Sequence, residues 1–189
     1  MSQSALLKKT AASLDHLGEP YMFTGSFVSS LQGEPRSTHD IDLVFVLSAD
    51  KIDALLAEFP APEYYANRAT IEQAIARRDV FNIVAVNEGD KVDFWLLKDD
   101  AFDQSRFARR KLVNYDGMEV FVSAAEDTIL MKLKWDHDSG GGTRQFYDAL
   151  RVYELQHAIL DHEYLQHWIH ELQLGESWQE ILARAKPVR

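Results

Sequence analysis

Two aspartates separated by one residue, Asp40 and Asp42, stand at the start of an apolar run, Leu43 to Leu47. Because side chains alternate between the two faces of a strand, a strand here would place both carboxylates on the same face. Two ionised carboxylates close together repel each other, and a divalent cation relieves that repulsion. Mg²⁺ favours a carboxylate pair combined with phosphate oxygens. The Asp-x-Asp pattern therefore predicts a metal site that acts on a phosphorylated substrate.

A third carboxylate, Asp93, lies inside another apolar segment, Lys91 to Leu97. An unpaired acid is costly to bury, so we expect Asp93 to face a polar site rather than the core. The preceding apolar run, Phe81 to Val86, is joined to this segment by a short turn-rich sequence, which predicts an antiparallel hairpin. If the hairpin lies beside the Asp-x-Asp strand, then Asp40, Asp42 and Asp93 become the predicted metal ligands.

A glycine-serine pair, Gly25-Ser26, follows a short predicted strand, Tyr21 to Thr24, and starts a predicted helix. The first backbone N–H groups of a helix can bind an anion, and glycine lets a ligand approach the backbone closely. Gly25 and Ser26 are thus candidate phosphate contacts, with an ordinary strand-to-helix turn as the alternative. Arg36, in the loop that follows, would either brace that loop or reach a phosphate.

Several residues predict where helices begin and end. Capping boxes at Thr70 to Gln73 and at Ser123 to Glu126 predict two helix starts. Thr143 and Asp161 have the side chains of N-cap residues, and Gly175 is expected to end a helix. From Ser123 onward the apolar spacing is helical.

The overall composition excludes several classes of function. The formal net charge of −10 disfavours an extended, non-specific DNA-binding surface, which needs a basic face. The absence of cysteine excludes disulfides, thiolate metal ligands and a cysteine nucleophile. The basic end of the segment Asp99 to Lys111 is either a solvated helix end or a contact for a nucleotide tail or RNA. With no signal peptide and no apolar run of about 20 residues, we expect a cytoplasmic protein with no membrane segment.

Gly25-Ser26, the Asp40-x-Asp42 pair and the later strand aspartate Asp93 resemble the signature of the nucleotidyltransferase superfamily with a polymerase-beta-like palm. Longer stretches resemble the AbiEii/AbiGii-type nucleotidyltransferase-like proteins of bacteria, and the resemblance runs from roughly Tyr21 to Ala185. These stretches are RSTHDIDL, KVDFWLLKDDAFDQSRFARRK, SAAEDTILMKLKW and GGGTRQFYDALRVYE.

The resemblance implies an α+β fold in two parts. Residues 1–122 would form a nucleotidyltransferase palm domain, with a mixed, largely antiparallel sheet flanked by helices. Residues 123–189 would form a C-terminal helical bundle that closes the nucleotide cleft.

The resemblance also implies roles for the acidic and phosphate-binding residues. Asp40 and Asp42 would hold one Mg²⁺ on the β- and γ-phosphates of a nucleoside triphosphate. Asp42 and Asp93 would share a second Mg²⁺ beside the acceptor hydroxyl, with Asp93 as the candidate general base. Ser26 and the helix that starts at Gly25 would bind the terminal phosphates.

In the helical region, Lys132 matches a lysine position of the family, and Lys134 is a second candidate. Arg144 and Asp148 match its Arg-Gln-x-x-Asp block. A lysine there would neutralise phosphate charge as a point cation. A structural ion pair between Lys132 and Asp148 is the alternative.

Three functions remain open at this stage. The first is a Mg²⁺-dependent nucleotidyltransferase that binds a nucleoside triphosphate such as ATP and modifies a tRNA or protein acceptor, as the toxin of a toxin-antitoxin pair. The second is an enzyme with a small-molecule, aminoglycoside-like acceptor, whose polycation would suit an acidic protein. The third is a non-catalytic nucleotide-binding or partner-binding module.

Overall fold

A computed structural model describes residues 3–38 and 40–186 of the chain. These residues form two compact units. The first unit comprises the described residues of Met1–Thr24 and Thr38–Val122, and the second those of Gly25–Ser37 and Ser123–Arg189. The short segment Gly25–Ser37 therefore belongs with residues much later in the sequence.

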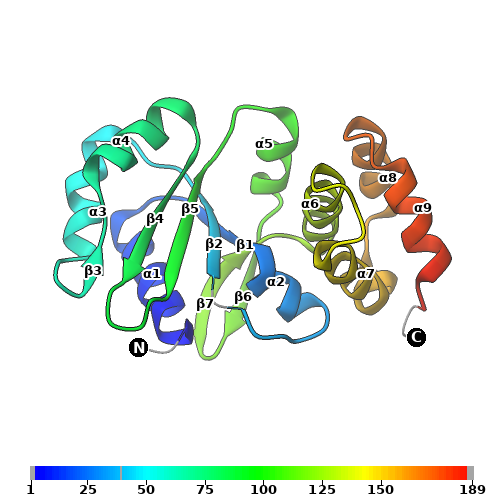
Figure 1. The fold of residues 1–189 in the computed structure, drawn as a ribbon, viewed down its shortest axis with the longest axis horizontal. Helices are drawn as coiled ribbons and strands as arrows, with labels where there is room; N and C mark the ends of the chain where they lie inside the picture. The colour runs from blue at the N-terminus through cyan, green and yellow to red at the C-terminus, as the bar shows by residue number, and fades with distance from the viewer. Residues whose placement is uncertain (1–2, 39, 187–189) are drawn as a thin grey trace. The chain divides into compact units, whose positions relative to one another are not determined.

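The first unit is built on a mixed sheet (Figure 1). Its strands are β1 (Tyr21–Thr24), β2 (Asp40–Phe45), β3 (Tyr64–Tyr65), β4 (Val80–Ala85), β5 (Lys91–Leu96), β6 (Lys111–Tyr115) and β7 (Met118–Val122). Among the described residues the strand order is β3-β4-β5-β2-β1-β7-β6. The β2–β5 and β1–β7 pairs are parallel, and the other neighbouring pairs are antiparallel. The predicted mixed, largely antiparallel sheet is confirmed.

Alternation along β5 separates a core face of this sheet from a polar face. Val92, Phe94 and Leu96 are buried, whereas the residues between them are partly exposed. The Phe94 ring stacks on Phe81 with ring centroids 4.9 Å apart. Helices of this unit are α1 (Gln3–Leu17), α3 (Ile52–Glu58), α4 (Arg68–Arg77) and α5 (Ala101–Ala108), with the 3₁₀ turn η1 (Ala49–Lys51).

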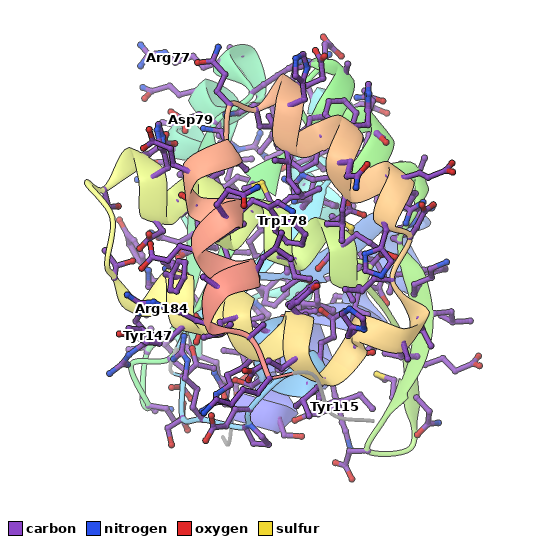
Figure 2. The ribbon with its side chains drawn as sticks, turned by 90° about the vertical axis from the view of Figure 1, so that its right-hand side faces the viewer. Arg77, Asp79, Tyr115, Tyr147, Trp178 and Arg184 are labelled. Carbon is purple, nitrogen blue, oxygen red and sulfur yellow. The ribbon has the colours of Figure 1, made fainter. Side chains whose placement is uncertain are left out.

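The second unit is helical in its described residues. Its helices are α2 (Gly25–Gln32), α6 (Ala125–Asp138), α7 (Arg144–Gln156), α8 (His162–Glu171) and α9 (Gly175–Arg184), with the 3₁₀ turn η2 (His157–Ile159). Trp178 and Arg184, both labelled in Figure 2, lie on α9. The Trp178 ring meets the Tyr153 ring edge-on at a centroid distance of 5.2 Å. The Arg184 guanidinium lies 5.4 Å from the centre of the Phe146 ring. Aromatic packing thus joins α9 to α7. In the described part of the chain, no helix is both long and apolar enough to cross a membrane.

Both predicted capping boxes were wrong. Helix α4 starts earlier than expected because the Asn67 side chain accepts a hydrogen bond from the Thr70 backbone N–H, which makes Asn67 the N-cap. Helix α6 has Ala124 as its N-cap with no side-chain cap. Ser123 instead shares a hydrogen bond with the Thr128 hydroxyl at 2.8 Å. In both places another nearby residue takes the predicted role: Asn67 caps α4, and Thr128 takes the hydroxyl of Ser123.

The prediction that Gly175 ends a helix was also wrong, because Gly175 is the first residue of α9. The chain leaves α8 through Gln173, which takes a left-handed backbone with φ of 58°. The N-caps predicted at Thr143 and Asp161 are confirmed, since each side chain accepts a backbone hydrogen bond from the first turn of its helix.

Candidate active site

The strand register brings three predicted carboxylates onto one face of the first unit. Strand β5 runs parallel to β2, and Asp42 is the Cα partner of Asp93. Asp40 pairs in the same way with Lys91. Because these residues are two apart on each strand, their side chains share one face. The predicted hairpin of β4 and β5, and its place beside the Asp-x-Asp strand, are confirmed.

Polar side chains on this face hold the carboxylates. The Lys91 ammonium donates to Asp93 Oδ2 at 2.7 Å and lies 3.6 Å from Asp40 Oδ1. The indole N–H of Trp95 donates to Asp42 Oδ1 at 3.2 Å. The hydrogen bond to Asp93, followed by the charges of the neighbouring aspartates, outweighs partial burial and raises the pKa of Lys91 above its usual range. Lys91 is therefore a protonated partner of this acidic face.

Three carboxylates at adjacent strand positions suit a divalent cation by donor type and by register. Among residues 3–38 and 40–186, however, no three acidic or histidine side chains are arranged so that they could hold a metal ion. The cation that Asp93 contacts in this structure is the ammonium of Lys91. Metal binding by Asp40, Asp42 and Asp93 thus stays a prediction.

A second group of chemically active side chains lies in the helical unit. We call it the Lys132 cluster; its members are Ser26, Arg36, Lys132, Gln145 and Asp148. The Lys132 ammonium donates to Asp148 Oδ2 at 2.8 Å, to Gln145 Oε1 at 2.6 Å and to Ser26 Oγ at 3.3 Å. Lys132 is only 1% exposed. The ion pair between Lys132 and Asp148, raised from the sequence as the structural alternative, is present.

Arg36 completes the cluster by joining helix α2 to helix α7. Its guanidinium donates from Nε to Asp148 Oδ1 at 3.1 Å and from Nη2 to Asp148 Oδ2 at 2.8 Å, a bidentate arrangement. Nη2 also donates to Ser26 Oγ at 2.7 Å. Burial acts to raise the pKa of Asp148, but the hydrogen bonds from Arg36 and Lys132 outweigh it and lower that pKa. One carboxylate is thus shared by two cations, which leaves one net positive charge on the three side chains.

A cavity of about 480 Å³ opens beside this cluster within the helical unit and is lined in part by Arg36, Arg144, Tyr147 and Arg151. Tyr147, labelled in Figure 2, is 52% exposed. Arg144 thus lies on the wall of the same cavity as Arg36, as a shared phosphate-binding role requires. The arginines line this cavity, whereas Lys132 is buried behind it and is not part of its lining.

The remaining predicted site residues are placed as follows. Gly25 begins α2 with φ of 68°, a backbone conformation that glycine adopts without strain. Lys134 is apart from the Lys132 cluster: its ammonium pairs with Asp138 Oδ2 at 2.6 Å, one turn along the same helix. Lys134 therefore makes an ordinary exposed helix pair in this structure.

Among the residues that contact predicted site residues, sequence reasoning missed Lys91, Trp95 and Gln145. The first two could have been found, because Lys91, Asp93 and Trp95 alternate on β5 and must share a face. The contact of Gln145 with Lys132 depends on how α6 packs against α7, and no local pattern reports it.

Comparisons with known proteins give a fold but no family. No family model matches the sequence, and no curated protein is similar to it. The crystal structure of ANT(2'')-Ia in complex with adenylyl-2''-tobramycin matches with a TM-score of 0.61 and 14% identity, over 92% of this chain and 98% of that one. The solution structure of ANT(2'')-Ia, an antibiotic-resistance factor, matches with a TM-score of 0.57 and 14% identity, over 94% and 95% of the two chains.

A third structure extends the likeness beyond that resistance factor. An antigenic nucleotidyltransferase-like protein from Paracoccidioides brasiliensis matches with a TM-score of 0.51 and 16% identity, over 97% of this chain and 93% of that one. At such identities the likeness establishes the fold, and the predicted fold class is confirmed. The chain has the α+β fold of the nucleotidyltransferases.

Proposed function

We propose that this protein is a metal-dependent nucleotidyltransferase that transfers a nucleotide from a nucleoside triphosphate to an acceptor. One observation carries the proposal: Asp42 on β2 is the register partner of Asp93 on β5, with Asp40 on the same face, in a fold shared with nucleotidyltransferases. These three acids lie together on the polar face of the sheet, where their like charges repel one another, so their alignment favours a chemical role.

In the proposed reaction, an acceptor hydroxyl oxygen forms a bond to the α-phosphorus, and the bond from that phosphorus to the bridging oxygen of the β-phosphate breaks. Pyrophosphate leaves, and Asp93 takes the hydroxyl proton. Magnesium held by Asp40, Asp42 and Asp93 would supply neutralisation of the triphosphate charge and activation of the acceptor hydroxyl.

Within the helical unit, the Lys132 cluster is the proposed anion-binding group. Strand β1 ends at Thr24 and helix α2 begins at Gly25, so Ser26 lies in the first turn of α2, whose backbone N–H groups can bind an anion. Arg36 holds Asp148 and also lines the cavity, so its guanidinium is the member of the cluster best placed to meet an anionic ligand. The cavity wall carries Arg36, Arg144 and Arg151 together with Glu34 and Asp148, so its arginines outnumber its acids by one.

For the acceptor, the sequence resemblance to AbiEii-type proteins favours an RNA, such as tRNA, or a protein, in a cytoplasmic toxin that is paired with an antitoxin. A small-molecule acceptor is the second candidate, because ANT(2'')-Ia, which shares the fold, was crystallised with adenylyl-2''-tobramycin. The net charge of −10 would also attract a polycationic acceptor.

A label-transfer assay tests both the reaction and the acceptor class. The protein is incubated with Mg²⁺ and each α-labelled triphosphate in turn, together with total tRNA, a protein extract or tobramycin. We expect one combination to become labelled, and we expect Asp93→Asn to lower that labelling by at least about 100-fold, as for loss of a general base.

Asp99→Asn is the matched control, because Asp99 is exposed in the same unit and pairs only with Arg78 among the interactions described. It should label its acceptor as the wild type does. Equal labelling by wild type and Asp93→Asn would contradict the assignment of the reaction to this face. Absence of labelling in every combination, with no binding of any triphosphate, would favour the non-catalytic module.

A further inference from the structure

Lys91 occupies a position among the predicted metal ligands that no part of the proposed reaction uses. It is the first residue of β5, the register partner of Asp40 and two residues before Asp93. Its ammonium is 2.7 Å from Asp93 Oδ2 and 3.6 Å from Asp40 Oδ1. The positive charge therefore lies between two carboxylates that belong to neighbouring strands.

The geometry of the Asp93 contact bears on metal binding. Mg²⁺ binds carboxylate oxygens at about 2.1 Å and prefers near-ideal octahedral geometry. An ammonium within hydrogen-bond distance of the same oxygen would hold a like charge close to the bound ion. The two cations repel each other, and the energy of two unit charges grows as their separation falls. The ammonium and a divalent ion thus cannot both take their best positions at Asp93.

We propose that Lys91 is a tethered counter-cation that neutralises the carboxylate face when no metal is bound and competes with the divalent ion for Asp93 and Asp40. The inference rests on the proposed function for the identity of the metal ligands. Lys91 is 38% exposed in its side chain, so its ammonium has room to swing into solvent when a metal ion binds. Lys91 thereby lowers the affinity of the carboxylate face for a divalent ion.

The same arrangement predicts opposite effects of Lys91 on the two states of the protein. Without metal, removing Lys91 leaves three carboxylates without the positive charge that it places between Asp93 and Asp40, so the protein becomes less stable. With metal, removing Lys91 abolishes the competitor, so the ion binds more tightly. A purely structural lysine would lower stability in both states and would leave the metal affinity unchanged.

The test compares wild type, Lys91→Met and the matched control Lys111→Met. Lys111 is also the first residue of its strand and lies on β6 in the same unit. Binding of Mn²⁺ is measured from the electron paramagnetic resonance signal of the free ion, which needs no activity. We expect Lys91→Met to bind Mn²⁺ roughly fivefold more tightly than wild type, as for the removal of about one partly exposed charge contact. Lys111→Met should match wild type.

A second readout is the melting temperature in EDTA at low ionic strength. Lys91→Met should melt about 2–4 °C below both wild type and Lys111→Met, and the gap should shrink at high salt because salt screens exposed charges. Saturating Mn²⁺ should then stabilise Lys91→Met more than wild type.

Three outcomes separate this inference from the proposed function. Equal Mn²⁺ affinity in wild type and Lys91→Met, with binding abolished by Asp93→Asn, would overturn the role of Lys91 and leave the metal ligands standing. No Mn²⁺ binding by wild type or by a folded Lys91→Met would overturn both. Tighter binding by Lys91→Met, with a lower melting temperature in EDTA, would support both.

Discussion

Replacing Lys132 by methionine should destabilise the helical unit by about 2–3 kcal/mol. Lys132 is 1% exposed, and its ammonium contacts Asp148, Gln145 and Ser26. Breaking a buried ion pair by removing one partner typically costs about 3–5 kcal/mol. The cost should fall below that range here, because Arg36 still holds both oxygens of Asp148 after the substitution. Methionine has a similar length, so the cavity contribution is small.

For a protein of 189 residues, a change of 1 kcal/mol shifts the melting temperature by about 2–4 °C, so Lys132→Met should melt roughly 5–10 °C below wild type. The assay is thermal unfolding followed by circular dichroism at 222 nm, with urea unfolding as the second measurement. Lys134→Met is the matched control on the same helix. Its exposed pair with Asp138 is worth about 0.3–0.5 kcal/mol, so its melting temperature should fall by about 1 °C.

A melting temperature of Lys132→Met within 1–2 °C of Lys134→Met would refute this reasoning. It would mean that the Lys132 cluster contributes no more to stability than a surface pair. In that case the contacts of Lys132 with Asp148, Gln145 and Ser26 could not explain why its side chain is buried.

Three further predictions concern the core and pH. Gly33→Ala should lower the free energy of unfolding by about 1–3 kcal/mol, because a Cβ there would lie 2.9 Å from a backbone oxygen and 3.0 Å from a backbone nitrogen. Gly175→Ala is its control: a Cβ at Gly175 would meet nothing within 4 Å, so urea unfolding should give the wild-type free energy within about 0.5 kcal/mol. Phe94→Ala should lower the free energy of unfolding by about 3–5 kcal/mol, because Phe94 is fully buried and stacked on Phe81. A decrease of less than about 1 kcal/mol would contradict the place of Phe94 in the core. Folding lowers the pKa of Asp148, so this carboxylate stabilises the fold at pH values above its ordinary pKa of 3.8, and that stabilisation is lost as the pH falls through the folded pKa. The difference in free energy of unfolding between wild type and Asp148→Asn should therefore narrow below about pH 4. A difference that does not change with pH would contradict the pairing of Asp148 with Arg36 and Lys132.

The sheet was predictable because its signals are local. Alternation of buried and exposed residues on β5, and the Asp-x-Asp spacing on β2, each fix which side chains share a face. Once the two strands are adjacent, Asp42 and Asp93 lie together with no further information. Lys91 follows from the same alternation and was missed only because its charge was not weighed with those of the acids.

The helical unit was less predictable because its contacts are long-range. Arg36 pairs with Asp148, which lies 112 residues further along the chain. Whether Arg36 braces its loop or binds a phosphate depends on its contact with Asp148. No residue near Arg36 in the sequence predicts that contact. The helix starts show the same effect on a smaller scale: Ser123 satisfies the capping pattern, yet its hydroxyl bonds to Thr128 instead.

The most direct test of the proposed function is calorimetric titration of each nucleoside triphosphate in the presence of Mg²⁺, with wild type and Asp42→Asn. Asp42 is the register partner of Asp93, so replacing it should disable the predicted metal site, while the amide oxygen of Asp42→Asn can still accept the hydrogen bond from the Trp95 indole. We predict that wild type binds one triphosphate in a Mg²⁺-dependent manner and that Asp42→Asn binds it at least about tenfold more weakly while keeping the wild-type circular dichroism spectrum. Equal affinity in the two proteins, or binding that persists in EDTA, would contradict a metal-dependent nucleotide site on this face.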